Sequence, residues 1–347
     1  MARVDAWNSG NAVPDEGRLI PRASIVMPCF GDGPGLRRAV AALEPALRAG
    51  HELILVDDAT PGGLSLELPE GARILRRPEN GGPGAARNDG VRASRQAIVV
   101  FVDADVVVRA DTVDRLVAHL VANARLDAVF GAYDAEPAHP TLISRWRNLL
   151  HHHTHQCGDP DAETFWAGCG AVRRAAFDRV SGFDTVRFPT PSVEDIDFGY
   201  RLRDAGGRIL LDPSIQVTHL KAWTFVDILH VDVTRRAIPW ARMLVGRRRG
   251  DRALNVSAAQ RACGVLAFVA IAASAVAAVQ PTLRDATLPI GLAALATIVV
   301  VNRHFFALLW RAGGFPLAIA SVAFQWMFYI YGTVGFLVGT LTAARRD

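Results

Sequence analysis

Short apolar runs that end on glycine or acidic residues recur along the first 220 residues of the chain. These runs lie at residues 24–28, 53–56 and 98–102. The second run ends on Asp57 and Asp58 and the third on Asp103 and Asp105, while a helical pattern over 36–49 follows the first. Strands that alternate with helices are typical of an α/β fold with a mostly parallel sheet covered on both faces. Ligands bind beyond the carboxyl ends of such strands, where both acidic clusters lie.

The last quarter of the chain has a different pattern, because apolar residues dominate it. Three stretches are long enough to cross a hydrocarbon core of about 30 Å. They lie at about 262–279, 286–301 and 314–341. The third is longer than one span needs, so we expect it to tilt or bend near Gly332, Gly335 and Gly339. A buried core hairpin is the alternative interpretation.

The remaining segments are polar or basic. Residues 1–22 have no apolar core, so no signal peptide is predicted there. Residues 231–260 mix apolar side chains with arginines, which favours an amphipathic helix at a membrane surface over a solvated linker. We therefore expect four regions: a polar extension at 1–22, an α/β domain at 23–230, a basic interface helix at 231–260 and a membrane domain at 261–347.

The distribution of arginines predicts an orientation. Seven arginines lie from Arg235 to Arg252, and only Arg284 lies in the first loop between apolar stretches. Arginines favour the anionic cytoplasmic leaflet, so we expect a multi-pass protein of the inner membrane, with its N-terminal domain in the cytoplasm and its C-terminus outside. Arg345 and Arg346 argue against a C-terminus on the outside. A mixed segment at 302–311 is predicted to lie in the interface.

Composition excludes several classes of protein. The 347 residues are 50% hydrophobic and 21% charged, with a net charge of +4 and four cysteines. Such a chain is neither disordered nor a disulfide scaffold, and its apolar end excludes a purely soluble enzyme. Lys221 is the only lysine, so the other 37 basic residues are arginines. Because the arginines gather at the membrane boundary rather than with aromatic stacking motifs, no nucleic-acid partner is predicted.

Asp103 and Asp105 are the first candidates for chemistry. Two residues apart on an extended segment, both carboxylates can project to one side and repel by roughly 3 kcal/mol at an effective dielectric near 20. A divalent cation, Mg²⁺ or Mn²⁺, turns this repulsion into binding. Gly31, Gly33 and Gly35 imitate a dinucleotide-binding loop, but the position of a third fingerprint glycine holds Leu36.

The acidic pairs belong to an ordered series of motifs. The series consists of Val56-Asp57-Asp58-Ala59-Thr60, Glu79-Asn80-Gly81-Gly82-Pro83-Gly84-Ala85-Ala86-Arg87-Asn88, Val102-Asp103-Ala104-Asp105, Gly168-Cys169-Gly170, Val193-Glu194-Asp195-Ile196-Asp197 and Thr218-His219-Leu220-Lys221. It covers roughly residues 24–223 and resembles family 2 of the glycosyltransferases. That family has a GT-A fold and transfers sugars from nucleotide-sugars with inversion.

The resemblance implies roles for the matching residues. Donor-binding residues would be Asp57, Asp58, Asn80, Arg87, Asn88, Asp103, Gly168 and Gly170, and metal ligands would be Asp103, Asp105 and His219. In this scheme the acidic pair recognises the nucleoside, Arg87 meets phosphate oxygens, and the glycines let the backbone approach the donor sugar.

Asp195 resembles the catalytic base, with Glu194 as the alternative base. Ser192 and Asp195 have the spacing of a capping box, which is a purely structural explanation. At the start of a helix, the dipole is expected to keep the Asp195 carboxylate ionised, as a base requires. Asp197 is expected to orient the site or to pair with an arginine.

These features predict an inverting glycosyltransferase that moves one sugar from a nucleotide-diphosphate sugar, a UDP-sugar being favoured. The acceptor would be a hydroxyl, with membrane lipids and cell-envelope glycan precursors as the candidates, at the cytoplasmic face. The alternatives are a processive polysaccharide synthase, although the Gln-x-x-Arg-Trp spacing is missing around Trp240, and a non-catalytic nucleotide-sugar-binding membrane protein. A nucleotidyltransferase would need a basic triphosphate loop near the first strand.

Two weaker signals stay open. The histidines between His151 and His155 invite a metal-site hypothesis, but no cysteine or carboxylate pattern completes it, so solvated or acceptor-facing histidines are favoured. Trp166 either contacts the acceptor or packs in the core.

Overall fold

The computed structural model describes residues 20–245 and 257–343. The chain divides into two compact units, which we describe separately. The first comprises Met1–Ala138 and His155–Lys221, and the second His139–Thr154 and Ala222–Asp347. Most of the predicted polar extension lies outside the described residues, as do the arginines between 247 and 252 and at 345 and 346.

A nine-stranded sheet forms the centre of the first unit, in the order β3-β2-β1-β4-β8-β6-β9-β5, with β7 pairing with β9. The strands are β1 (Ser24–Cys29), β2 (Glu52–Asp57), β3 (Ala72–Arg76), β4 (Ile98–Val102), β5 (Val106–Val107), β6 (Ala128–Tyr133), β7 (Asp161–Ala162), β8 (Cys169–Arg173) and β9 (Ile209–His219). Strands β1 to β4 pair in parallel, while β8 runs antiparallel between β4 and β6. The predicted α/β class is confirmed, with a sheet that contains both parallel and antiparallel strand pairs.

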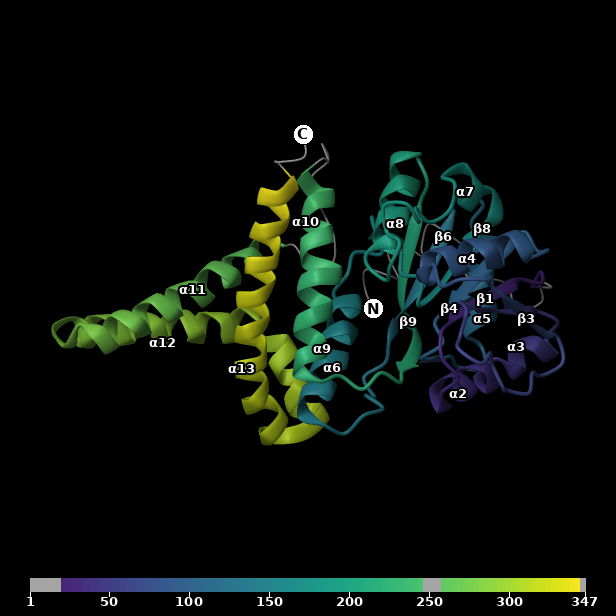
Figure 1. Ribbon diagram of the computed structural model, residues 1–347. Helices are drawn as coiled ribbons and strands as arrows, with labels where there is room; N and C mark the ends of the chain where they lie inside the picture. Colours follow the sequence, from purple (N-terminus) through teal and green to yellow (C-terminus); the bar gives the residue numbers. More distant parts are fainter. Residues whose placement is uncertain (1–19, 246–256, 344–347) are drawn as a thin grey trace. The chain divides into compact units, whose positions relative to one another are not determined.

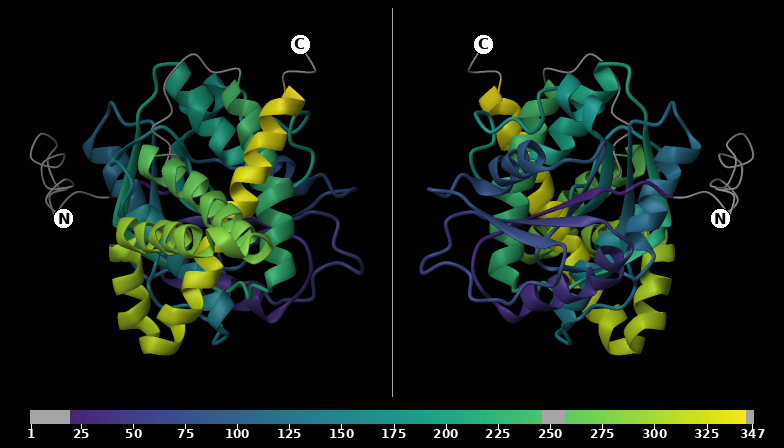
Figure 2. Two further views of the ribbon diagram at one scale, coloured as in Figure 1. Left: turned by 90° about the vertical axis from the view of Figure 1, so that its left-hand side faces the viewer. Right: turned by 90° about the vertical axis from the view of Figure 1, so that its right-hand side faces the viewer.

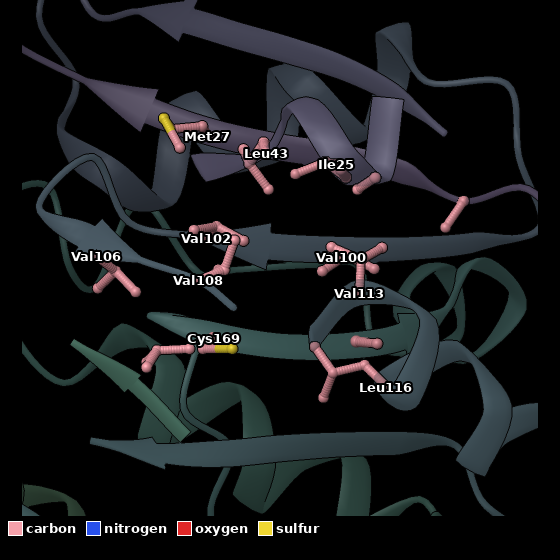
Figure 3. Packing of buried hydrophobic residues seen from close by; sticks show 14 of the residues in the cluster. Ile25, Met27, Leu43, Val100, Val102, Val106, Val108, Val113, Leu116 and Cys169 are labelled. Carbon is pink, nitrogen blue, oxygen red and sulfur yellow. The ribbon is translucent and has the colours of Figure 1, made fainter. Parts of the chain in front are cut away.

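Helices cover both faces of this sheet. They are α2 (Pro34–Ala42), α3 (Glu44–Arg48), α4 (Gly82–Ala93), α5 (Thr112–Ala122), α7 (Arg174–Arg179) and α8 (Glu194–Asp204). Ile25 and Met27 of β1 belong to a buried cluster that includes Val113 and Leu116 of α5 (Figure 3). The intervening Val26 meets the other face, where a Cβ on Gly90 of α4 would lie 2.4 Å from its Cγ1. The helix predicted over 36–49 is two helices.

The sheet topology brings distant residues to one edge. Strands β2 and β4 are parallel neighbours of β1, so Asp57 and the segment after Val102 emerge at the same edge. Strand β9 is parallel to β6, and both run in the direction of β4 because β8 is antiparallel to each of its neighbours. His219, the last residue of β9, therefore reaches this edge too, and it pairs with Val106 of β5.

Helices make up the described part of the second unit (Figure 1). They are α6 (Leu142–Gln156, whose last two residues belong to the first unit), α9 (Phe225–His230), the π-helix η1 (Val231–Ala237), α10 (Ile238–Val245), α11 (Ala258–Val279), the 3₁₀ turn η2 (Pro281–Leu283), α12 (Arg284–Val301) and α13 (Arg303–Ala343). Helices α9, η1 and α10 follow one another without a break, so this helix begins before the predicted interface segment.

Helix α13 bends at a different glycine from those predicted. Gly314 has φ 64° and ψ −161°, which interrupts the helix two residues before Pro316. Gly335 and Gly339 instead allow close packing, since added Cβ atoms would lie 2.7 Å from Ala237 Cβ and 2.6 Å from Ala241 Cβ. The segments 258–279, 281–301 and 303–343 are long and apolar enough to cross a membrane.

Candidate active site

Asp105 and His219 lie together at the carboxyl edge of the sheet. His219 Nε2 lies 3.4 Å from Asp105 Oδ2. The backbone holds this arrangement, because the N–H of Leu220 donates to the carbonyl of Asp105 at 2.8 Å. The two residues come together through the pairing of β5 with β9.

A carboxylate and an imidazole in contact suit a divalent cation. Burial acts to raise the pKa of Asp105, but the hydrogen bond and charge of His219 outweigh it and lower that pKa, so the carboxylate is ionised. Its side chain is 45% exposed and open to a further partner. The His219 ring stacks on Tyr133 at 4.4 Å between centroids. Tyr133 could not be predicted from the sequence, because no motif marks it.

The third predicted metal ligand, Asp103, faces a guanidinium instead. Arg87 donates to Asp103 Oδ1 at 2.6 Å and to Glu194 Oε1 at 3.1 Å. No group of three or more His, Cys, Asp or Glu side chains able to hold a metal occurs within residues 20–245 and 257–343. Asp105 and His219 therefore form a candidate cation site of two residues, and metal binding by Asp103 stays a prediction.

Arg87 is buried at the centre of the candidate site. It is 4% exposed and lies 5.5 Å from the centroid of the Phe183 ring. Burial alone would lower the pKa of Arg87, but the charges of Asp103 and Glu194 raise it, so the guanidinium stays charged. Arg87 hydrogen-bonds to the carboxylates of Asp103 and Glu194, and its contact with donor phosphate stays a prediction.

Asp195 lies in the first turn of α8. The helix begins at Glu194, and its N-cap is Val193, whose side chain has no oxygen. The capping-box explanation is therefore wrong. Asp195 Oδ1 accepts from the N–H of Ile196 at 2.8 Å, and Oδ2 accepts from the N–H of Ala167 at 3.4 Å.

The surroundings of Asp195 favour its protonated form. Burial, followed by the negative charge of Glu194, raises the pKa of Asp195 to about 7, and Arg87 opposes this only in part. Burial and the adjacent charge thus act against ionisation of this carboxylate, whereas the helix dipole was expected to favour it. A carboxyl group with a pKa near neutrality can accept and return a proton at physiological pH.

Asp57 and Asp58 hold neighbouring loops. The N–H groups of Gly81 and Gly82 donate to the Asp58 carboxylate at 3.1 and 2.8 Å, which fixes the start of α4. Asp57 accepts from the N–H of Thr60 at 2.8 Å.

Two arginines at the end of β3 pair with these acids: Arg76 with Asp57 at 2.6 Å, and Arg77 with Asp58. Neither arginine could be predicted from the sequence, because β3 is a half-buried strand with no clear apolar run.

Both asparagines predicted to bind the donor contact the backbone. The Asn80 amide donates to the carbonyl of Asp58 at 3.1 Å. The Asn88 amide donates to the carbonyl of Phe183 at 2.8 Å and accepts from its N–H at 2.9 Å. For these asparagines, as for Asp57 and Asp58, a role in donor binding stays a prediction.

Gly168 and Gly170 make room for the protein's own aromatic rings. A Cβ on Gly168 would lie 2.5 Å from the Trp166 indole, and one on Gly170 would lie 2.7 Å from the Phe165 ring. Trp166 packs edge-on against Tyr133 at 4.6 Å, as the core interpretation requires. Access of a donor sugar to these glycines stays a prediction.

Asp197 and the histidine cluster at 151–155 are the last of the predicted residues, and they have different surroundings. Asp197 pairs with Arg187 at 3.1 Å and with Arg201 at 2.6 Å, which confirms its predicted pairing with arginine. Of the histidine cluster, His155 packs on Trp166 in the first unit at 5.0 Å, while His151 lies 3.3 Å from a guanidinium nitrogen of Arg236 in the second.

Comparisons with known proteins agree with this architecture. Residues 24–181 match the family model described as Glycosyl transferase family 2. The chain is 30% identical over 224 residues to the pre-mycofactocin glycosyltransferase of Mycobacterium tuberculosis, covering 59% of this chain and 44% of that protein. It is 35% identical over 104 residues to the uncharacterized glycosyltransferase EpsJ of Bacillus subtilis, covering 28% and 30%. The matched region thus spans less than half of each relative.

A solved structure shares the fold. The mannosyltransferase PcManGT from Pyrobaculum calidifontis, in complex with GDP-Man and Mn²⁺, superposes with a TM-score of 0.52 and 18% identity, covering 99% of this chain and 93% of its own.

The buried guanidinium gives a prediction about stability. Arg87→Met should lower the free energy of unfolding by about 3–5 kcal/mol near neutral pH, because it leaves the buried Glu194 carboxylate and the half-buried Asp103 carboxylate without a cation. Unpaired buried carboxylates have raised pKa values in the folded state, so the loss should shrink as the pH falls and they take up protons. Urea titration of detergent-solubilised protein at several pH values measures this.

Arg92→Met, in the last turn of the same helix, is the matched control. Arg92 is 71% exposed and pairs with Asp89 at the surface, so its loss should change stability by about 1 kcal/mol or less. Equal destabilisation by the two substitutions would contradict the importance of the buried cation.

Proposed function

We propose that the protein transfers one sugar from a nucleotide-diphosphate sugar to an acceptor hydroxyl with inversion, because residues 24–181 match the family model described as Glycosyl transferase family 2. One observation carries the proposal. Asp195, a carboxyl group whose pKa is raised to about 7, is joined through Glu194, Arg87 and Asp103 to the segment that bears Asp105. The ion pairs of Arg87 thus link the residue next to a proton acceptor with the segment that bears a candidate cation site.

The transfer is a single displacement in this proposal. The acceptor oxygen forms a bond to the anomeric carbon while the bond from that carbon to the diphosphate oxygen breaks, and Asp195 takes the acceptor's proton. Arg87 pairs with Glu194 and with Asp103 and so holds these two side chains on either side of the site. Asp105 and His219 would hold Mg²⁺ or Mn²⁺, which supplies positive charge against a diphosphate when bound.

The donor is a nucleoside diphosphate sugar, with UDP-sugars first in a screen because the resemblance to the family favours them. GDP-mannose belongs in the same screen, since the solved mannosyltransferase binds it together with Mn²⁺.

The acceptor is a membrane lipid or a cell-envelope glycan precursor at the cytoplasmic face of the inner membrane. Long apolar helices and the arginines from Arg235 to Arg252 support this site of action.

Replacing the proposed base tests the mechanism. Asp195→Asn should lower the rate of nucleoside diphosphate release by at least about a hundredfold while donor affinity changes little, because a general base contributes about 10²–10⁴ in rate. Release with and without acceptor measures the first quantity and donor titration the second. Asp204→Asn, an exposed acid in the last turn of the same helix, is the control and should retain full activity. Near-normal turnover by Asp195→Asn would exclude it as the base.

The raised pKa of Asp195 predicts the pH dependence. A base acts only when ionised, so the rate should rise about tenfold per pH unit up to about pH 7 and then level. Glu194→Gln removes a charge that raises the pKa of Asp195, so the rising part of the pH–rate profile should move to lower pH while activity persists. Loss of all activity in Glu194→Gln would instead favour Glu194 as the base.

Removal of Asp105 tests the cation site. Asp105→Ala should abolish the dependence of donor affinity on Mn²⁺, because it leaves His219 as the one remaining member of the pair. Calorimetric titration of the nucleotide-sugar with and without Mn²⁺ measures the difference. Asp111→Ala, an exposed acid nearby in sequence, should keep the dependence. An unchanged Mn²⁺ effect in Asp105→Ala would overturn the assignment.

A further inference from the structure

Helix α13 has two different faces beyond its bend. Its buried face includes Leu317, Ser321, Gln325, Tyr331, Gly335 and Gly339. Beyond the bend, the most exposed of its large apolar side chains are Phe315 at 62%, Ile319 at 54%, Leu337 at 52% and Leu341 at 65% exposure. At 100° per residue these four fall within about 80° of one another, opposite the buried face. A helix with one covered and one apolar open face suits a membrane surface.

The helices that cover α13 are strongly charged. Asp232 of η1 accepts from the hydroxyl of Tyr331 at 2.8 Å and pairs with Arg147 of α6. Arg236 lies 3.5 Å from the same carboxylate. If α13 crossed the membrane, these helices would have to accompany it into hydrocarbon, at roughly 2.5–3.5 kcal/mol for each charged side chain on insertion scales.

Both ends of this segment are tied to charged helices. The Arg145 guanidinium of α6 donates to the carbonyl of Ala312, just before the bend. At the other end, Arg242 of α10 donates to the hydroxyl of Thr342 at 3.0 Å. The stretch 139–154, which bears Arg145, leaves and rejoins the first unit within 16 residues. It is too short to cross a bilayer and return.

The hairpin formed by α11 and α12 runs in a different direction from α13. It extends away from α13, across the long axis of that helix (Figures 1 and 2). Along it Val265, Val279 and Leu292 are 63%, 77% and 66% exposed. The 22 residues of α11 measure about 33 Å and the 18 of α12 about 27 Å, which matches a hydrocarbon core of about 30 Å.

Polar groups mark both ends of the hairpin. At its base, Tyr329 of α13 donates to Gln260 at 2.5 Å and lies 3.0 Å from Asn302 Oδ1. The hairpin thus leaves α13 near the middle of that helix. Its tip carries Arg284 and Asp285, which favour water over hydrocarbon.

We propose that the α11–α12 hairpin alone crosses the membrane. Helix α13 then lies in the interface with its open face, defined by Phe315, Ile319, Leu337 and Leu341, against the acyl chains of one leaflet. This arrangement replaces the three spans expected from hydropathy with two. Two crossings return the chain to the side of the membrane from which the hairpin starts, so α13 lies on the same side as α10. The arginines that follow α13 in the sequence, Arg345 and Arg346, also favour the cytoplasmic side.

Single cysteines in the full-length protein test the topology. Thr282→Cys lies at the exposed tip of the hairpin and Asp347→Cys at the C-terminal residue. The native Cys157, exposed in the first unit, is the reference, and Cys157→Ser provides the background for the other two because Cys29, Cys169 and Cys263 are buried. A membrane-impermeant maleimide applied to sealed right-side-out and inverted vesicles should label Asp347→Cys with Cys157 from one side, and Thr282→Cys from the other.

Other outcomes overturn the proposal. Labelling of Asp347→Cys from the same side as Thr282→Cys means that α13 crosses. Labelling of all three cysteines from one side means that the hairpin does not cross the membrane.

Depth measurements provide a second test. Nitroxides at Ala323→Cys and Leu341→Cys lie on one exposed face of α13, about 27 Å apart along the axis. They should show equal ratios of oxygen to nickel-chelate accessibility. Ile271→Cys and Val279→Cys of α11, the matched pair in the hairpin, should differ severalfold. A much deeper nitroxide at 323 than at 341 would overturn the interfacial placement of α13.

Discussion

One buried cation holds the candidate site together. Arg87 joins the acid that follows β4 to the acid that opens α8, so two elements distant in the sequence present carboxylates to one small volume. Without the guanidinium these charges would repel and draw water into the site. The same arrangement leaves Asp195 beside Glu194, with a pKa near neutrality. Stability and acid–base chemistry therefore depend on the same ion pairs.

The second unit also contains a buried charge that neighbouring side chains compensate. Asp232 is buried between helices and is compensated by Arg147 and by the hydroxyl of Tyr331. Small residues, Gly335 and Gly339 against Ala237 and Ala241, let the backbones come close enough for these polar contacts. A charged helix and an apolar helix can thus pack in parallel, which hydropathy along the chain does not reveal.

The strands that carry the predicted motifs could be read from local patterns, because a buried strand needs a short apolar run whatever surrounds it. The runs at 24–28, 53–56 and 98–102 are strands in the structure. The half-buried edge strand β3 has no such run, so Arg76 and Arg77 could not be predicted as partners of Asp57 and Asp58. The contact between His219 and Asp105 was implied only by the resemblance. The pairing of β5 with β9 brings these two residues together, and the two strands are far apart in the sequence.

Local sequence patterns were enough to predict the α/β class, the acidic strand ends and the long apolar helices, because each of these depends on residues that are neighbours along the chain. The tertiary structure alone decided which acids are already paired, why the pKa of Asp195 is raised and which face of α13 is covered. These properties depend on burial and on charges contributed by distant segments. A local pattern of side chains contains neither.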